Sequence, residues 1–98
     1  MSKFQEIING NTPVLVDFYA VWCGPCKMMP PILKELKDKV GDDVRIIKID
    51  VDKNQKLSAQ YGIRSIPTLM LFKNGQAVWQ QAGVASADQL QKVIKAHS

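Results

Sequence analysis

The sequence predicts an α/β protein built on a mixed four-stranded sheet, in which two parallel strands are joined by an antiparallel hairpin. Residues 14–19 form a continuous run of β-branched and aromatic side chains, which indicates a buried strand. A helical pattern separates this run from a second apolar stretch, so these two strands should be parallel. Asn74-Gly75 lies between two further apolar runs and is a strong hairpin signal. The predicted order of elements is α-β-α-β-α-β-β-α.

The first half of the chain divides at its glycines and prolines. We expect a short helix over residues 2–8, ended by Asn9-Gly10, and then the strand at 14–19. A longer helix should begin near Gly24-Pro25, because proline suits the first helical turn, and run to Val40. Pro30-Pro31 falls inside this pattern and should kink the helix about one turn after its start.

The second half continues the alternation. Residues 44–51 predict a strand, and residues 54–61 a short helix that stops at Gly62. Residues 68–72 and 77–79 are the predicted hairpin strands. Ser86 and Gln89 have the spacing of a capping box, so the last helix should begin there and bury Leu90, Val93 and Ile94.

Size and composition are those of one globular domain, which we expect to span residues 1–98. The chain is 46% hydrophobic and 22% charged, and its 98 residues can bury one core without disulfide or metal staples. No segment approaches the ~18 apolar residues of a membrane span. Residues 1–6 lack the features of a secretory leader. We therefore expect a cytoplasmic monomer with no membrane partner.

The net charge of +4 arises from 13 basic and 9 acidic residues that are spread along the chain. Nucleic-acid binding proteins usually gather their basic residues on one face. The pattern favours an ordinary solvated surface, so we expect no nucleic-acid partner.

Cys23 and Cys26 form a Cys-x-x-Cys pair at the end of the first strand and the start of a helix. A thiolate near a helix N-terminus is stabilised, so the pKa of Cys23 should fall below the ~8.5 of a free cysteine. Cys26 lies one turn further on the same side, where it can attack a mixed disulfide at Cys23. The pair therefore predicts thiol–disulfide exchange.

Two other roles for the pair are weaker. A zinc site needs about four nitrogen or sulfur ligands, and the chain offers only these cysteines and the distant His97. A structural disulfide between residues three apart closes a very small loop, which stabilises a fold little. We therefore expect no bound metal.

Three segments together resemble the thioredoxin family, and the match covers nearly the whole chain. They are residues 16–27 (VDFYAVWCGPCK), 61–68 (YGIRSIPT) and 72–75 (FKNG). The resemblance implies a thioredoxin-like fold with helices on both faces of the sheet. The chain begins around the family's first helix, so the usual first strand is expected to be missing. The strand at 44–51 then becomes an exposed edge.

The resemblance implies further site residues beside Cys23 and Cys26. Pro67 aligns with the family's cis proline facing the cysteines, although the sequence alone favours a trans bond. Asp17 aligns with a buried aspartate that relays a proton to or from Cys26, and burial should raise its pKa. A water-facing Asp17 at the strand end is the alternative. Lys48 aligns with a lysine near that aspartate, or else simply extends into solvent.

An apolar surface that docks extended substrate segments is also implied around Cys23. Its residues would be Trp22, Gly24, Pro25, Ile66, Pro67, Ala82, Gly83 and Val84. Trp22 has an alternative role as a core aromatic. Tyr19 stands where many family members carry a second tryptophan, a mild departure that keeps an aromatic ring.

The resemblance predicts a protein-disulfide reductase with disulfide-containing proteins as substrates. Its electrons would come from NADPH through a thioredoxin reductase, and the protein itself would bind no cofactor. The Gly24-Pro25 spacer resembles that of reducing members, whereas oxidising relatives usually carry histidine there. The alternatives are a thioredoxin-fold binding module or subunit, and a disulfide oxidase or isomerase.

Overall fold

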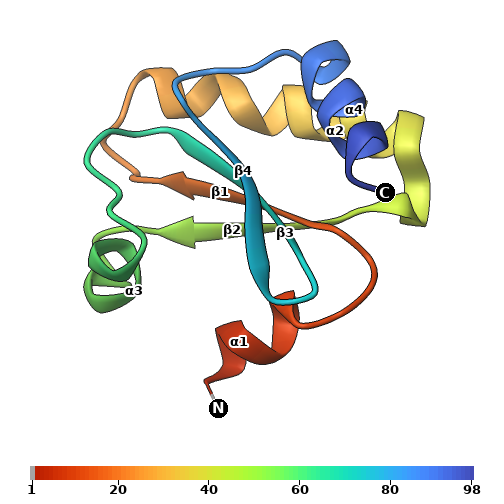
Figure 1. Ribbon diagram of the computed structural model, residues 1–98. Coiled ribbons are helices and arrows are strands. Elements are labelled where there is room, and N and C mark those ends of the chain that lie inside the picture. The colour runs from red at the N-terminus through yellow and green to blue at the C-terminus, as the bar shows by residue number, and fades with distance from the viewer. Residues whose placement is uncertain (1) are drawn as a thin grey trace.

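A four-stranded sheet with strand order β2-β1-β3-β4 forms the centre of the computed structural model, which describes residues 2–98 (Figure 1). Strand β1 pairs in parallel with β2 and antiparallel with β3, and β3 pairs antiparallel with β4. The predicted mixed sheet is confirmed, with β2 at one edge. The strands are β1 (Val14–Tyr19), β2 (Arg45–Asp50), β3 (Thr68–Lys73) and β4 (Gln76–Ala82).

Helices cover both faces of the sheet, as the family resemblance implies. On one face, α2 and α4 lie side by side across the strands (Figure 1). On the other face, α1 and α3 pack against the remaining side chains of the same strands. None of the helices formed by residues 2–98 is long and apolar enough to cross a membrane. The helices are α1 (Lys3–Ile8), α2 (Met29–Val40), α3 (Gln55–Gln60) and α4 (Ala87–Ala96), with short 3-10 helices at Pro25–Met28 and Gly41–Asp43.

The strand β1 is buried on both faces, which explains its continuous apolar sequence. Leu15 packs with residues of α2 and α4, whereas Val14, Val16 and Phe18 pack on the side of α1 and α3. This alternation follows from the two-residue period of a strand. It places Asp17, the one charged residue of β1, on the same face as Leu15.

The predicted helix from Gly24-Pro25 to Val40 differs from the structure near its start. Residues Pro25–Met28 form a 3-10 helix, and the α-helix α2 begins only at Met29. Pro30 and Pro31 then lie in the first turn of α2, where backbone N–H groups have no helical partner. The prolines therefore start the α-helix instead of kinking it.

The predicted start of the last helix is confirmed, but only half of the capping box forms. The Ser86 hydroxyl accepts a hydrogen bond from the Gln89 backbone N–H, at 3.1 Å. The Gln89 side chain does not return to Ser86; it donates to the Gln81 side chain at 2.7 Å. Tertiary contact with β4 thus competes successfully with the local bond.

The hairpin turn is also confirmed, and its second strand is longer than predicted. Asn74 and Gly75 have φ angles of 52° and 81°, as a tight turn between twisted strands requires. Strand β4 covers Gln76–Ala82 because pairing with β3 continues through its glutamines and alanines. Glutamine and alanine do not favour strands by themselves, so the sequence did not predict this extension.

Candidate active site

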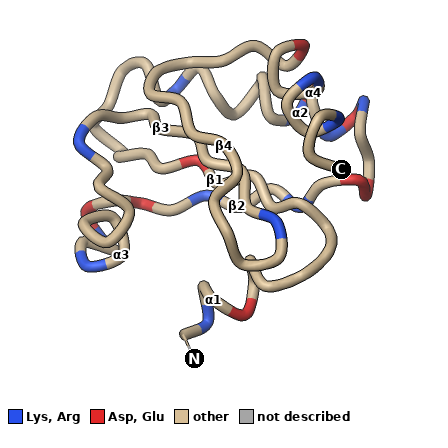
Figure 2. The backbone as a smooth tube through the Cα atoms, viewed as in Figure 1, with Lys and Arg blue, Asp and Glu red and all other residues tan. Residues whose placement is uncertain are grey.

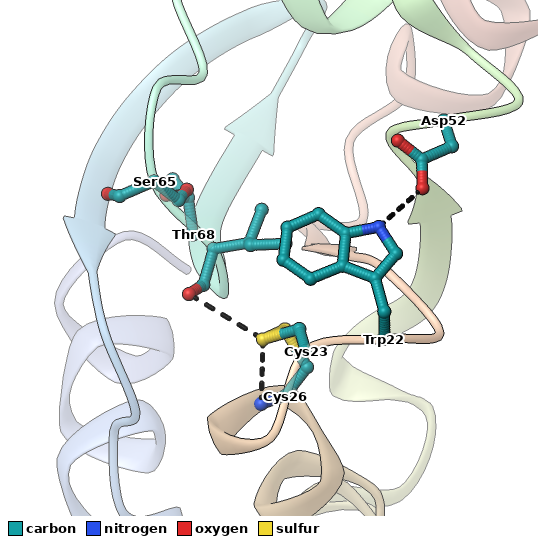
Figure 3. The surroundings of a disulfide bond; sticks show 7 residues. Trp22, Cys23, Cys26, Asp52, Ser65 and Thr68 are labelled. Carbon is teal, nitrogen blue, oxygen red and sulfur yellow. Dashed lines mark hydrogen bonds between the residues drawn. A yellow bond between two sulfur atoms is a disulfide. The ribbon is translucent and has the colours of Figure 1, made fainter.

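Cys23 and Cys26 lie where β1 has ended and the 3-10 helix begins, and they are joined by a disulfide bond (Figure 3). Their Cα atoms are 5.3 Å apart. The exposed fractions of the two residues are 4% and 5%, so accessibility does not distinguish them. The hydrogen-bond partners around the two sulfur atoms distinguish them.

The Cys23 sulfur accepts a hydrogen bond from a backbone N–H group. The Cys26 N–H donates to Cys23 Sγ at 3.2 Å (Figure 3). An N–H donor at this position would stabilise negative charge on the Cys23 sulfur after reduction. Cys23 Sγ also lies 3.7 Å from the Ile66 carbonyl oxygen. A disulfide sulfur has no proton to donate, so this is a packing contact here and becomes a hydrogen bond only in the reduced thiol.

The segment at Ile66-Pro67 faces the cysteines, although it is distant in sequence. Ile66 packs against the apolar cluster of Ala20 and the two cysteines. The Ile66-Pro67 peptide bond is cis, which confirms the prediction from the family resemblance. The Gly83 N–H donates to the Pro67 carbonyl oxygen at 2.8 Å. Gly83 is therefore joined to Pro67, whose neighbour Ile66 contacts Cys23.

Trp22 is exposed, so its alternative role as a core aromatic is wrong. The exposed fraction of Trp22 is 68%, and its Nε1–H donates to Asp52 Oδ2 at 2.7 Å (Figure 3). Gly24 and Pro25 are exposed as well. The indole is thus held by one polar contact while its ring remains accessible beside Cys23.

Asp52 is a residue of this site that the sequence did not identify. It follows β2, and the cysteine segment follows β1. The carboxyl ends of neighbouring parallel strands lie at the same edge of a sheet, which is where α/β proteins place their sites. An acidic residue two positions after the second parallel strand is therefore the sequence signal from which Asp52 could have been predicted.

Asp17 is buried in β1, as the family resemblance implies, so the alternative of a water-facing residue at the strand end is wrong. Its exposed fraction is 1%, and neither carboxylate oxygen has a hydrogen-bond partner among the described residues. Desolvation raises the pKa of Asp17 from 3.8 to about 6, and the charge of Lys48 opposes this shift. A carboxyl group with this pKa can take up or release a proton close to neutral pH.

Lys48 lies beside Asp17 and also reaches solvent, so both sequence-based expectations for it describe part of its environment. The register of the parallel strands pairs Asp17 with Lys48. The Lys48 ammonium nitrogen lies 4.9 Å from the centre of the Tyr19 ring, a cation–π contact. The ring of Tyr19 therefore holds the lysine over β1, while the residue as a whole remains exposed.

The candidate catalytic groups are the disulfide-bonded cysteine pair and the buried carboxyl group of Asp17. Among residues 2–98, no three His, Cys, Asp or Glu side chains come together as a metal site requires. His97 lies at the C-terminal cap of α4. The chemistry that this cysteine pair can perform is thiol–disulfide exchange.

Comparisons with known proteins give one family. The sequence model of the thioredoxin family matches residues 1–96. A thioredoxin of Haemophilus influenzae is 50% identical over 91 residues, which cover 93% of this chain and 85% of that protein. A thioredoxin of Alicyclobacillus acidocaldarius is 49% identical over 90 residues, covering 92% and 86%.

Solved structures agree with the sequence comparisons. A mutant thioredoxin from Halobacterium salinarum superimposes with a TM-score of 0.89 at 39% identity, covering 99% of this chain and 84% of that one. Oxidised mitochondrial thioredoxin 3 from Saccharomyces cerevisiae gives a TM-score of 0.84, also at 39% identity, covering 96% and 87%.

Proposed function

The chain belongs to the thioredoxin family, and from this membership we propose how its residues divide the work of disulfide reduction. The family and the paired cysteines make the protein a thiol–disulfide oxidoreductase that reduces protein disulfides. The observation that supports the division of roles is the hydrogen bond from the Cys26 N–H to Cys23 Sγ. It favours Cys23 as the attacking thiolate.

In the first step, the Cys23 thiolate attacks one sulfur of a substrate disulfide. A mixed disulfide forms between Cys23 and the substrate, and the other substrate sulfur leaves as a thiolate that takes up a proton. Trp22, Gly24, Pro25, Ile66, Pro67 and residues 82–84 form the surface on which the substrate segment docks.

In the second step, the Cys26 thiolate attacks Cys23 Sγ. The bond between Cys23 and the substrate breaks, the Cys23–Cys26 disulfide forms, and the second substrate sulfur leaves as a thiolate that takes up a proton, so two electrons have passed to the substrate. Asp17, as a carboxylate, accepts the proton of the Cys26 thiol and becomes a neutral carboxylic acid, for which its raised pKa suits it. The charge of Lys48 favours the carboxylate form that is present before this transfer.

The oxidised pair must then be reduced again by a partner. We propose that a thioredoxin reductase supplies the electrons from NADPH, that disulfide-containing proteins are the substrates, and that the protein acts in the cytoplasm as a monomeric domain spanning residues 1–98. This assigns it to electron transport and cell redox homeostasis.

Reduction of insulin by dithiothreitol tests these roles. We expect the wild-type protein to accelerate the reaction and Cys23→Ser to fall to the uncatalysed rate. Cys26→Ser should also lose turnover, but it should accumulate a mixed disulfide with a substrate protein, which mass spectrometry detects. A stable mixed disulfide in Cys23→Ser instead would contradict the assignment of the attacking thiol.

Two alternatives have their own outcomes. If neither the wild type nor the variants accelerate insulin reduction, a binding function on the same fold takes the place of turnover. Equilibration with glutathione separates a reductase from an oxidase, because an oxidase would leave its own cysteine pair largely reduced under conditions that oxidise a reductase.

A further inference from the structure

Large apolar side chains are seldom exposed in this protein, and most of the exposed ones gather at the cysteine pair. Among residues 2–98, the exposed large hydrophobic residues are Val21, Trp22, Met28 and Val78. Trp22 belongs to the proposed docking surface, whereas Val21 and Met28, which are 68% and 57% exposed, have no part in the proposed exchange. Each of these two lies two residues outside the cysteine pair. A single exposed apolar residue is ordinary, but a cluster beside a reactive group indicates contact with another molecule.

The backbone turn before Cys23 exposes Val21. The Cys23 N–H donates to the Ala20 carbonyl oxygen at 3.2 Å, which closes a turn with Val21 and Trp22 at its two central positions. Ala20 and Cys23 are buried and pack in one apolar cluster. The ends of the turn are therefore anchored in the core, and its two central side chains are left in solvent.

The 3-10 helix exposes Met28 on the other side of the cysteine pair. Side chains three residues apart are eclipsed in a helix of this type. Pro25 and Met28 share the outer face of this segment and are exposed, whereas Cys26 and Met29 share the inner face and are buried. Met28 thus continues the exposed apolar surface of Pro25 by one turn.

The segments that form the docking surface are uncharged over long stretches. Residues 18–26, 65–72 and 74–87 contain no Lys, Arg, Asp or Glu, and the tube in Figure 2 is tan along them. A charged side chain next to the reacting cysteine of a substrate would find no opposite charge on these segments. Apolar side chains there would lose no such partner, and they would gain by covering the exposed apolar residues.

The burial of the disulfide requires a substrate to make close contact with the surface around it. Cys23 and Cys26 are only 4% and 5% exposed. A substrate sulfur must nevertheless approach Cys23 Sγ to a bonding distance of about 2 Å. The residues on both sides of the substrate cysteine are then pressed against the turn and the 3-10 helix that surround Cys23.

We propose that Val21 and Met28 bind apolar side chains next to the reacting cysteine of a substrate, so that the protein prefers disulfides with apolar flanking residues. This inference rests on the proposed reduction of protein disulfides and adds a side-chain preference to it. Neither residue belongs to the docking set that the family resemblance implies.

Two peptide disulfides test the preference. Each is a symmetrical disulfide dimer of a short peptide with one cysteine, which is flanked on both sides by leucine in one form and by serine in the other. Dithiothreitol regenerates the protein, and the rate without protein is subtracted. We expect the wild type to reduce the leucine form with a kcat/KM about tenfold higher, mainly through a lower KM, since burial of one methylene group corresponds to about a fourfold change in affinity.

Three variants locate the preference on the surface. Val21→Ser/Met28→Ser should reduce it to about twofold or less, because the apolar contacts are lost. Met28→Leu should keep it, because leucine preserves the apolar volume. Val78→Ser is the matched control: it makes the same exchange of valine for serine at an exposed position on β4, and it should keep the preference of the wild type. Thermal unfolding verifies that each variant is folded.

Several results would overturn the inference. Equal kcat/KM values of the wild type for the two peptides would do so and would leave the reductase function intact. A preference that persists in Val21→Ser/Met28→Ser would belong to the rest of the docking surface, and an equal loss in Val78→Ser would not be specific to the site. A peptide-free dimer, seen by sedimentation, that dissociates in the double variant would mean that a second copy of the chain covers these residues. If the wild type reduces neither peptide nor insulin, the proposed function itself fails, and this inference fails with it.

Discussion

Asp17 is the residue at which the fold and the proposed function make opposite demands. Burying a carboxylate without a hydrogen-bond partner is unfavourable, and, among the described residues, this structure does so in β1, an inner strand of the sheet. The unfavourable term is the same desolvation that raises the pKa of Asp17 to about 6. A proton acceptor near neutral pH is therefore obtained at the expense of stability.

Asp17→Asn should stabilise the protein at high pH and have little effect at low pH. The folded protein binds more protons than the unfolded chain between pH 3.8 and about 6, so wild-type stability falls as the pH rises through this window and is level above it. A shift of two pKa units corresponds to about 3 kcal/mol. Urea denaturation of the oxidised proteins at pH 8 should show a gain of about this size.

At pH 3.5, where Asp17 is protonated in both states, the two proteins should have nearly equal stability. A gain that is the same at both pH values would mean that side-chain shape, and not charge, is responsible. The same variant should turn over insulin more slowly at pH 7, since the Cys26 thiol loses its proton acceptor.

At the scale of elements, the hairpin and the first helix stabilise each other's ends. The Asn74 N–H donates to the Gly10 carbonyl and the Gly75 N–H to the Ile8 carbonyl, both at 2.9 Å. These bonds satisfy carbonyls at and after the end of α1, which the helix itself leaves without partners. The tight turn thus fixes both the strand register and the position of α1.

Gly75→Ala should destabilise the protein by about 1–2 kcal/mol. The φ angle of Gly75 is 81°, and an added Cβ would lie 3.0 Å from the Asn9 side-chain oxygen. Gly10→Ala is the matched control, because a Cβ at Gly10 meets nothing within 4 Å. Thermal unfolding should therefore show a lower midpoint for Gly75→Ala than for Gly10→Ala. Equal midpoints would show that the turn tolerates a side chain.

At the scale of the whole molecule, the sheet order brings the parts of the site together. The parallel pairing of β1 with β2 places the segments that follow the two strands at the same end of the sheet. Trp22, next to Cys23, therefore lies within hydrogen-bond distance of Asp52. The antiparallel pairing of β1 with β3 brings Ile66-Pro67, at the start of β3, to the same edge. The core that fixes these pairings therefore also determines the site geometry.

Leu71→Ala tests how far stability depends on this core. Leu71 lies in β3, is fully buried and packs in the cluster formed with α2 and α4. Its truncation removes buried methyl groups and leaves a cavity, so we expect a loss of about 3–4 kcal/mol in urea denaturation. The control Val78→Ala, at a position that is 36% exposed on β4, should lose less than about 1 kcal/mol. A similar loss in both variants would contradict the central position of Leu71.

The sequence by itself determined the element order, the hairpin turn, the position of the cysteine pair and the cap at Ser86, because each depends on residues close together in the chain. Periodicity, turn chemistry and capping act over a few residues. The cis bond before Pro67 and the pairing of Asp17 with Lys48 were expected only through the family resemblance, since local sequence does not contain them.

Tertiary structure alone decided several other features. It left Trp22 exposed and hydrogen-bonded to Asp52, moved the Gln89 side chain from Ser86 to Gln81, and extended β4 through residues without a strand signal. It also left both carboxylate oxygens of Asp17 without a hydrogen-bond partner among residues 2–98. Each of these depends on which distant segments pack together, and that is set by the sum of many weak contacts across the core.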